Sequence, residues 1–156
     1  MYLQQLQAYE QWIAELETEI AKTFRESDAC RRLATVPGIG PIIATALVSS
    51  VGDPSQFRNG RQFAAWLGLT PTQRSSGGKS LPGSITKRGD SYLRTLLVQG
   101  ARAVMHFVHR RDDRHSRWIQ AVMHRRHPSV AAIALANKTA RIAWVILTSD
   151  AAYKTA

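Results

Sequence analysis

The sequence predicts an all-α fold: an N-terminal coiled-coil helix followed by a helical domain with a helix–hairpin–helix motif. Three observations support this fold class. Apolar residues recur every three or four positions through most of the chain, apolar content is 44%, and no stretch shows a convincing strand pattern. The 156 residues suit one domain plus an appended element. We therefore expect a coiled-coil oligomerisation helix over residues 1–28 and a helical domain over residues 29–150.

The first helix carries an apolar seam whose members lie three or four residues apart: Tyr2, Leu6, Tyr9, Ile13, Leu16, Ile20 and Phe24. This spacing is typical of a coiled coil. An isolated helix of this length is marginally stable in water, so the seam needs a partner. The partner is a second subunit or a helix of the same protein, and the alternative is an amphipathic helix lying on its own domain. We predict a homo-oligomer held through this helix.

Residues 33–50 predict the helix–hairpin–helix motif. A short helix ends before Pro37, Gly38 and Gly40 make a tight turn, and a second helix runs from about Pro41 to near Ser50. The residues expected to pack the two helices together are Leu33, Val36, Ile39, Ala44 and Leu47. Backbone N–H groups at a helix N-terminus form an anion site, and such a turn can hold a DNA phosphate without reading bases. A purely structural hairpin is the alternative.

Four more helices are expected. One covers residues 57–67 and stops at Gly68, one is capped by Asp90 or Ser91 and runs to about Arg110, one lies within residues 110–127, and one covers residues 130–148. The second of these has the apolar face Leu93, Leu96, Leu97, Val104 and Phe107, where Gly100 allows close helix approach. The third has a basic side, which is either a DNA-backbone stripe or a solvated face. Ser129 is expected to cap the last helix.

Composition limits the location of the protein. The opening residues form a polar helix pattern rather than a signal peptide. The longest apolar run, residues 130–147, is interrupted by Asn137, Lys138 and Arg141, so we expect no membrane partner. Cys30 is the single cysteine, which excludes an intrachain disulfide and fits a packed residue in a reducing cytoplasm.

The charge is strongly basic and unevenly placed. The net charge is +10 and the pI is about 10.6. Residues 1–28 carry six acids against two bases, whereas the remainder carries 19 bases against five acids. A globular segment this basic is typical of proteins that bind a polyanion, with nucleic acid ahead of membrane. The acidic helix therefore does not belong to the anion-binding part.

The segment 70–89 combines hydroxyls, glycines and bases, and it is expected to be a loop. Ser75 and Ser76 precede Gly77 and Gly78, which let backbone N–H groups approach an anion. A hydroxyl beside a clamped phosphate is a candidate nucleophile. The alternative is a mobile, solvated loop. The residues expected to bind DNA are Gly38, Gly40, Arg58, Arg61, Arg74, Gly77, Gly78, Lys79, Lys87, Arg88 and Arg94.

Carboxylates are scarce in the basic part of the chain. After residue 28 they are Asp53, Asp90, Asp112, Asp113 and Asp150. A two-metal nuclease site needs several converging carboxylates, so we predict no metal site and no cofactor in this chain. The pairs His106/His109 and His124/His127 lack an evident third ligand. Any chemistry would come from the serines, with the acid–base or metal partner supplied from elsewhere.

Four ordered blocks of the sequence resemble a known family. LATVPGIGPIIATALVSSVGD, FRNGRQFAAWLGLTPTQRSSGGK, ITKRGDSYLRTLLVQGAR and ALANKTARIAWVIL are similar to the C-terminal domain of DEDD-type insertion-sequence transposases. This family includes the bridge-RNA-guided recombinases and the pilin-gene DNA invertase. The resemblance covers roughly residues 33–147, and the heptad helix resembles the coiled coil that precedes this domain.

The resemblance implies a divided active site. In the family an N-terminal nuclease-like domain holds Mg²⁺ with carboxylates, and the C-terminal domain supplies a serine that attacks a DNA phosphodiester at a site formed between subunits. The family serine falls on Ser76, with Ser75 as the second choice. The chain shows no carboxylate domain, so we expect an excised part or a shortened reading frame that binds DNA without cutting it alone. A structured guide RNA is a further partner that the resemblance allows.

Two other readings of the sequence remain open. One is a helix–hairpin–helix DNA-binding module without catalysis. The other is a basic helical scaffold that dimerises through residues 1–26 and binds RNA.

Overall fold

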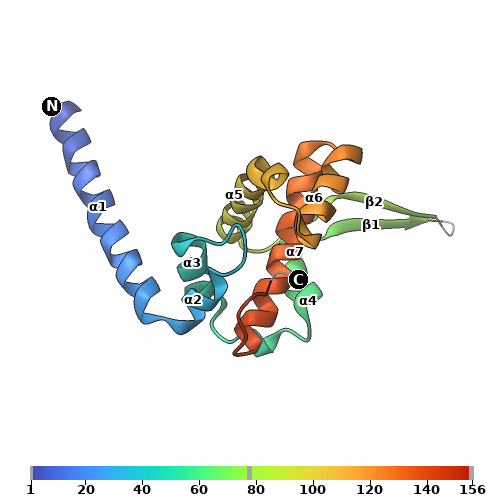
Figure 1. Ribbon diagram of the computed structural model, residues 1–156, viewed down its shortest axis with the longest axis horizontal. Helices are drawn as coiled ribbons and strands as arrows, with labels where there is room; N and C mark the ends of the chain where they lie inside the picture. The colour runs from blue at the N-terminus through green and yellow to red at the C-terminus, as the bar shows by residue number, and fades with distance from the viewer. Residues whose placement is uncertain (1, 77–78, 155–156) are drawn as a thin grey trace.

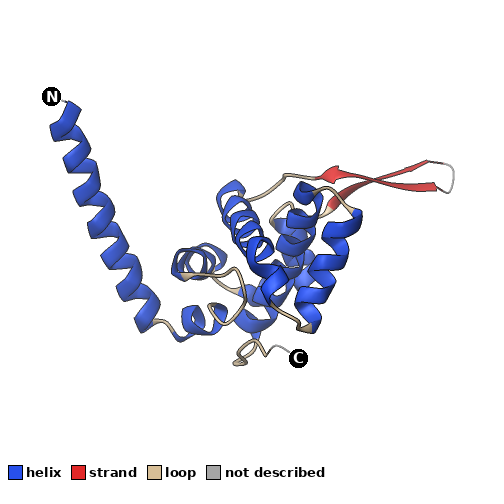
Figure 2. Ribbon diagram, turned by 45° about the horizontal axis from the view of Figure 1, so that its top comes forward, coloured by secondary structure: helices blue, strands red, loops and turns tan. Residues whose placement is uncertain are grey.

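A computed structural model describes residues 2–76 and 79–154, while the side chains of residues 73–82 lie outside the description. The described chain is mostly helical, which confirms the helical class, and it also contains one β-hairpin (Figures 1 and 2). The elements in order are α1 (Tyr2–Glu26), α2 (Asp28–Leu33), α3 (Pro41–Val51), the 3₁₀ turn η1 (Pro54–Gln56), α4 (Gly60–Trp66), β1 (Pro71–Ser76), β2 (Lys79–Ile85), α5 (Ser91–Phe107), η2 (Val108–Arg110), α6 (Arg114–Arg125) and α7 (Pro128–Thr148).

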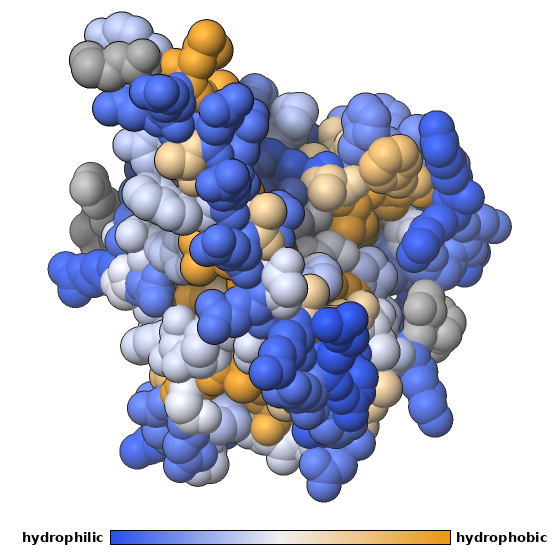
Figure 3. All heavy atoms as spheres, turned by 90° about the vertical axis from the view of Figure 1, so that its left-hand side faces the viewer, coloured by the Kyte–Doolittle hydropathy of each residue, from blue (hydrophilic) through white to orange (hydrophobic). Residues whose placement is uncertain are grey.

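Helix α1 projects from the rest of the molecule as a long arm (Figure 1). It contains no fully buried residue, and only its C-terminal part contacts the domain, where Phe24 packs against the core. The seam residues Leu6, Ile13 and Leu16 are each more than half exposed. Figure 3 shows hydrophobic spheres among strongly hydrophilic ones on this side of the molecule. The predicted helix is confirmed, and its pairing with a second helix stays a prediction.

Helices α2 and α3 pack against each other as the sequence predicts. Leu33, Val36, Ile39, Ala44 and Leu47 are all buried. Gly38 adopts φ +89°, and a Cβ atom there would lie 2.9 Å from the carbonyl oxygen of Gly100 in α5. The predicted close approach at Gly100 is therefore confirmed, and its partner is the glycine turn.

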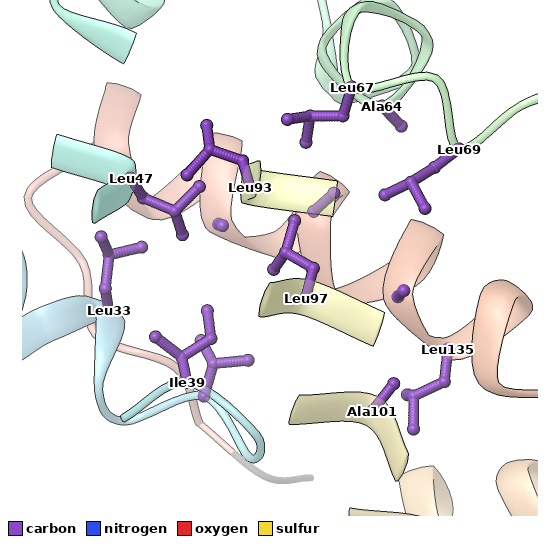
Figure 4. Packing of buried hydrophobic residues seen from close by; sticks show 14 of the residues in the cluster. Leu33, Ile39, Leu47, Ala64, Leu67, Leu69, Leu93, Leu97, Ala101 and Leu135 are labelled. Atoms are coloured by element: carbon purple, nitrogen blue, oxygen red, sulfur yellow. The ribbon is translucent and has the colours of Figure 1, made fainter. Parts of the chain in front are cut away.

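Helix α5 occupies the centre of the core. Leu93, Leu97 and Ala101 of this helix lie among buried residues of α2, α3, α4 and α7 (Figure 4). Asp90 caps α5 by accepting a hydrogen bond from the N–H of Leu93 at 2.9 Å, as predicted. Phe107 differs from the prediction, since it is 51% exposed and Met105 is buried in its place.

Helix α7 runs the length of the domain. It is long and apolar enough, by length and composition alone, to cross a membrane. Its residues buried in the domain are Ala131, Ala132, Leu135, Ala136, Thr139, Ala140, Ala143 and Ile146. This burial is typical of the core helix of a globular domain. Two contacts fix α7 to the preceding segments: Trp144 donates to the carbonyl of Pro54 at 3.0 Å, and Asn137 donates to that of Leu69 at 3.1 Å.

The prediction of a loop over residues 70–89 was wrong. Strands β1 and β2 form an antiparallel hairpin in which Arg74 pairs with Leu81, Ser75 with Ser80, and Ser76 with Lys79. The signal for this hairpin is the Gly-Gly pair between two extended segments. The strands were not predicted because they are mostly polar and include Pro82, whereas strands usually contain β-branched and aromatic residues and seldom contain proline.

Two helix starts also differ from the prediction. Residues 57–59 precede α4, whose N-cap is Asn59, because the Asn59 side chain accepts from the N–H of Gln62. Helix α6 lies within residues 110–127 as predicted and begins at Arg114, because Asp113 caps it. His127, rather than Ser129, caps α7, and Pro128 takes the first helical position, where its missing N–H costs nothing.

Candidate nucleic-acid interface

The stem of the serine hairpin is fixed between α4 and α5. Gly68 and Gly89 have positive φ angles of +72° and +87°, and a side chain at either would clash with the facing backbone, at Arg88 and Trp66 respectively. Two backbone hydrogen bonds close the stem: the N–H of Thr86 donates to Thr70 and that of Lys87 to Gly68. The two segments therefore touch backbone to backbone, which a residue with a Cβ atom would prevent.

Arg94 locks the same junction. Its Nη1 donates to the carbonyl oxygens of Leu67 at 3.1 Å and of Arg88 at 3.3 Å. Arg94 was predicted to bind DNA. In the structure, one nitrogen of its guanidinium holds the hairpin stem instead, and the DNA contact stays a prediction. Lys87 adopts φ +54°, an uncommon value for a residue with a side chain. Lys87 and Arg88 are exposed beside this junction.

The candidate nucleophiles sit at the far end of the hairpin. The backbones of Ser75 and Ser76 are the last two positions of β1, and the hairpin extends away from the helices (Figures 1 and 2). Gly77 and Gly78 lie outside the described residues, as do the side chains of Ser75, Ser76, Arg74 and Lys79. The fixed stem thus carries two strands whose described ends, Ser76 and Lys79, lie away from the helices.

The other predicted DNA ligands lie on α4 and the glycine turn. Arg58 and Arg61 are exposed on either side of the α4 N-cap. In the turn, the N–H of Ile39 donates to the carbonyl of Val36 at 3.0 Å, so that N–H is already used. Gly40 is exposed and caps α3 without a side-chain hydrogen bond. The anion site predicted at this turn therefore cannot use the N–H of Ile39.

Most aspartates have a structural role. Asp53, Asp90 and Asp113 cap η1, α5 and α6. Hydrogen bonds from the side chain and backbone of Ser55 hold the pKa of Asp53 below its ordinary value. Hydrogen bonds from Ser116 likewise hold the pKa of Asp113 below its ordinary value, and the bond from its backbone N–H has the larger effect. No group of three or more His, Cys, Asp or Glu residues that could hold a metal occurs in the described part of the chain.

A large groove lies beside the hairpin stem and was not predicted from the sequence. We call it the α7 groove, with a volume of about 1400 Å³, lined by Pro71 and residues 83–85 of the hairpin, the face of α7 from Ser129 to Val145, and residues 151–154. Its apolar wall includes Val130, Ile133, Ile142 and Val145, and its charged lining residues are Arg61, Lys138, Arg141 and Lys154. The signal was the Lys138 and Arg141 pair within an apolar helix, which sequence reasoning used only to argue against a membrane span.

Aromatic contacts shape one end of this groove. The Lys138 ammonium lies 4.1 Å from the centre of the Trp118 ring, and His115 stacks on Trp118 with centroids 6.3 Å apart. Burial lowers the pKa of Lys138, and the nearby charges of Arg114 and Arg141 lower it further. Burial likewise lowers the pKa of His115, whose buried Nε2 has no partner among the described residues. The groove therefore concentrates positive charge at a partly desolvated site.

Comparisons with known proteins show what this chain is similar to. A family model described as "Transposase IS116/IS110/IS902 family" matches residues 30–124. The chain is 51% identical over 150 residues to a "Probable family 20 transposase" of Pseudomonas aeruginosa, covering 96% of this chain and 44% of that protein. It is 41% identical over 142 residues to the "Transposase for insertion sequence element IS1111A" of Coxiella burnetii, covering 91% of this chain and 39% of that protein.

A third relative has a similar name. The "Transposase for insertion sequence element IS1328" of Yersinia enterocolitica is 43% identical over 141 residues, which is 90% of this chain and 42% of that protein. The chain thus spans less than half the length of these curated relatives. The matched family model covers more than half of the chain, from Cys30 in α2 through the glycine turn and the serine hairpin to His124 in α6. This chain belongs to the IS116/IS110/IS902 family of transposases.

Proposed function

We propose that the chain is the DNA-binding, serine-bearing part of an insertion-sequence transposase or site-specific recombinase. The observation that carries the proposal is the hairpin: a stem fixed to α4 and α5 holds two serines at a projecting end in a chain of this family, with Lys87 and Arg88 exposed at the stem and Arg58 and Arg61 exposed at the start of α4. Bases around the stem would hold the DNA backbone while the tip reaches a phosphodiester.

Ser76 is the proposed nucleophile and Ser75 the second choice. The Ser76 hydroxyl oxygen forms a bond to phosphorus while the bond from phosphorus to one deoxyribose oxygen breaks. The serine proton passes to a base of the carboxylate domain, and the released oxygen takes up a proton. A free serine is a weak nucleophile, so this step depends on that base and on neutralised phosphate charge.

Mg²⁺ belongs to the carboxylate domain in this proposal, as the family resemblance implies. The described aspartates of the helical domain serve as helix caps or ion-pair partners instead. The 156-residue chain would therefore bind DNA without cleaving it. Helix α1 would bring copies together through a coiled coil, because its apolar seam is exposed. The helix–hairpin–helix turn at Gly38–Gly40 would add a phosphate contact.

The test is a covalent adduct between protein and DNA. With the carboxylate domain joined to this chain and Mg²⁺ present, the wild-type protein should give a protein–DNA adduct on a denaturing gel. Ser76→Ala should abolish the adduct and leave DNA binding intact, and Ser75→Ala should have the smaller effect. An adduct that survives Ser76→Ala but not Ser75→Ala would move the assignment to Ser75. If neither substitution matters, the second candidate function stands: a non-catalytic helix–hairpin–helix DNA-binding module.

A further inference from the structure

The acids and bases of the chain are distributed unequally around the α7 groove. The whole sequence contains eleven carboxylates, and every one lies in a described segment. Five glutamates lie on α1, and Asp53, Asp90 and Asp113 are helix caps. Asp28 and Asp150 pair with Arg32, and Asp112 lies 3.7 Å from Arg117. None of the eleven lines the groove.

The bases of the groove consequently have no Asp or Glu partner among its lining residues. Arg61 comes from α4, Lys138 and Arg141 from α7, and Lys154 from the C-terminal segment, so four basic residues of three segments meet at one site. Arg114 of α6 is near enough to act electrostatically on Lys138. Like charges gathered without an acid raise the local potential, and an anion relieves their repulsion. The residues whose side chains lie outside the description, 1, 73–82, 155 and 156, include no Asp or Glu.

The size and walls of the groove indicate what kind of anion fits. Its volume of about 1400 Å³ exceeds the roughly 300–1000 Å³ of small-molecule pockets, so a polymer segment is a better match. The apolar wall from Val130 to Val145 suits bases and sugars, and the basic residues suit phosphates. A duplex keeps its bases stacked inside and presents phosphates to the protein, which would leave this wall unused.

We propose that the α7 groove binds a single nucleic-acid strand next to the serine hairpin, with phosphates on Lys138, Arg141 and Arg61. The inference rests on the proposed function, because hairpin residues 71 and 83–85 form one wall of the groove. A strand reacting at the hairpin tip would continue past the stem into this groove. Since Lys138 and His115 already contact the Trp118 ring, the bases would lie on aliphatic side chains rather than stack on Trp118. Binding should therefore be tolerant of base identity.

The test uses the 156-residue chain and a labelled single strand of roughly 16 nucleotides, within the range that single-strand-binding domains cover. Lys138→Gln with Arg141→Gln should weaken strand binding by about tenfold and lower the log–log salt slope by about 0.7 for each phosphate that is no longer bound. Binding of the corresponding duplex should change far less. Arg102→Gln with Arg111→Gln removes the same charge from exposed positions outside the groove and should leave strand binding close to wild type.

A second variant tests the apolar wall without changing charge. Val130→Ser with Val145→Ser, two residues that are about half exposed, should weaken strand binding and keep the salt slope. Circular dichroism of each variant checks that it folds. Equal losses in the groove and control variants, or equal losses for strand and duplex, would overturn the proposal. So would groove variants that keep strand binding but lower the mass in light scattering, because the groove would then be a contact between copies.

The outcomes also separate this inference from the proposed function. A wild-type chain that binds duplex DNA but no single strand refutes the groove proposal alone. A wild-type chain that binds neither nucleic acid refutes the DNA-binding function, and the groove proposal with it.

Discussion

Glycines at the hairpin stem show how single residues fix the candidate site. Gly52 and Gly89 both have positive φ angles, but a Cβ atom at Gly52 meets open space, whereas one at Gly89 collides with the carbonyl oxygen of Trp66. Gly52 combines φ +61° with ψ −107°, outside the left-handed helical region, so Gly52→Ala should cost backbone strain alone, about 1–3 kcal/mol. Gly89→Ala should add a steric cost of roughly 1–3 kcal/mol. Urea unfolding of the two variants measures the difference, and equal midpoints would mean that the stem does not need this close contact.

His115 predicts a pH effect on stability. Burial lowers its pKa in the folded protein, the Lys138 charge lowers it further, and Asp113 opposes them. As pH falls below the ordinary pKa of 6.5, His115 therefore binds a proton more readily in the unfolded chain than in the folded chain. The free energy of unfolding consequently decreases as pH decreases. The contribution is fully present above pH 6.5. His115→Gln should flatten this dependence in thermal melts, whereas exposed His109→Gln should keep the wild-type profile. A wild-type profile that is flat between pH 7 and 5 would exclude the effect.

The structural role of a residue was predictable from sequence where it depended only on neighbouring residues in the chain. Asp90 caps α5 and Gly68 follows α4, since a cap or a left-handed turn depends on a few neighbouring residues. His115 and Lys138 were missed as a pair because they are 23 positions apart and meet only through the packing of α6 on α7. The exposure of Phe107 was missed since periodicity assigns a face but not where a helix leaves the core.

Among the elements, α1 was predicted most closely and the hairpin least. Seven-residue spacing sustained over 25 residues is a strong signal for a helix. The two hairpin strands, PTQRSS and KSLPGSI, are short and mostly polar, so their sequence gives no alternating apolar pattern to detect. The Gly-Gly turn and the stem glycines were the available signals, and they were assigned to a loop.

The exposed seam of α1 leads to a prediction about assembly. Ile13→Asp with Leu16→Asp places charge in the seam and should lower the mass seen by light scattering, because coiled-coil cores reject charged side chains. Gln4→Asp with Gln11→Asp adds the same charge to exposed positions off the seam and should leave the mass unchanged. All four positions are exposed in the single chain, so neither change should unfold the domain. An unchanged mass in the seam variant would place the interface elsewhere.

At the scale of the whole molecule, charge differs between the α1 arm and the helical domain. The five glutamates and two bases of α1 lie on the arm, while the helical domain has Lys87 and Arg88 exposed at the hairpin stem and four bases lining the α7 groove. This division was readable from sequence because charge needs no fold to be counted. Which bases share one surface was not readable, since Arg61, Lys138 and Lys154 converge only through the packing of α4, α7 and the C-terminal segment.

Duplex binding should consequently depend steeply on salt and on domain bases alone. Each phosphate contact contributes about 0.9 to the log–log slope of affinity against salt, because bound cations are released from the duplex. Arg58→Gln with Arg88→Gln should reduce the slope by about one unit per contact and weaken all sequences alike. Lys22→Gln with Arg25→Gln removes equal charge from α1 and should leave the slope unchanged. Fluorescence anisotropy over a salt series measures both variants. A flat salt dependence in the wild-type chain would refute backbone-dominated binding, and an equal loss from the α1 variant would show that net charge, rather than the domain surface, sets the affinity.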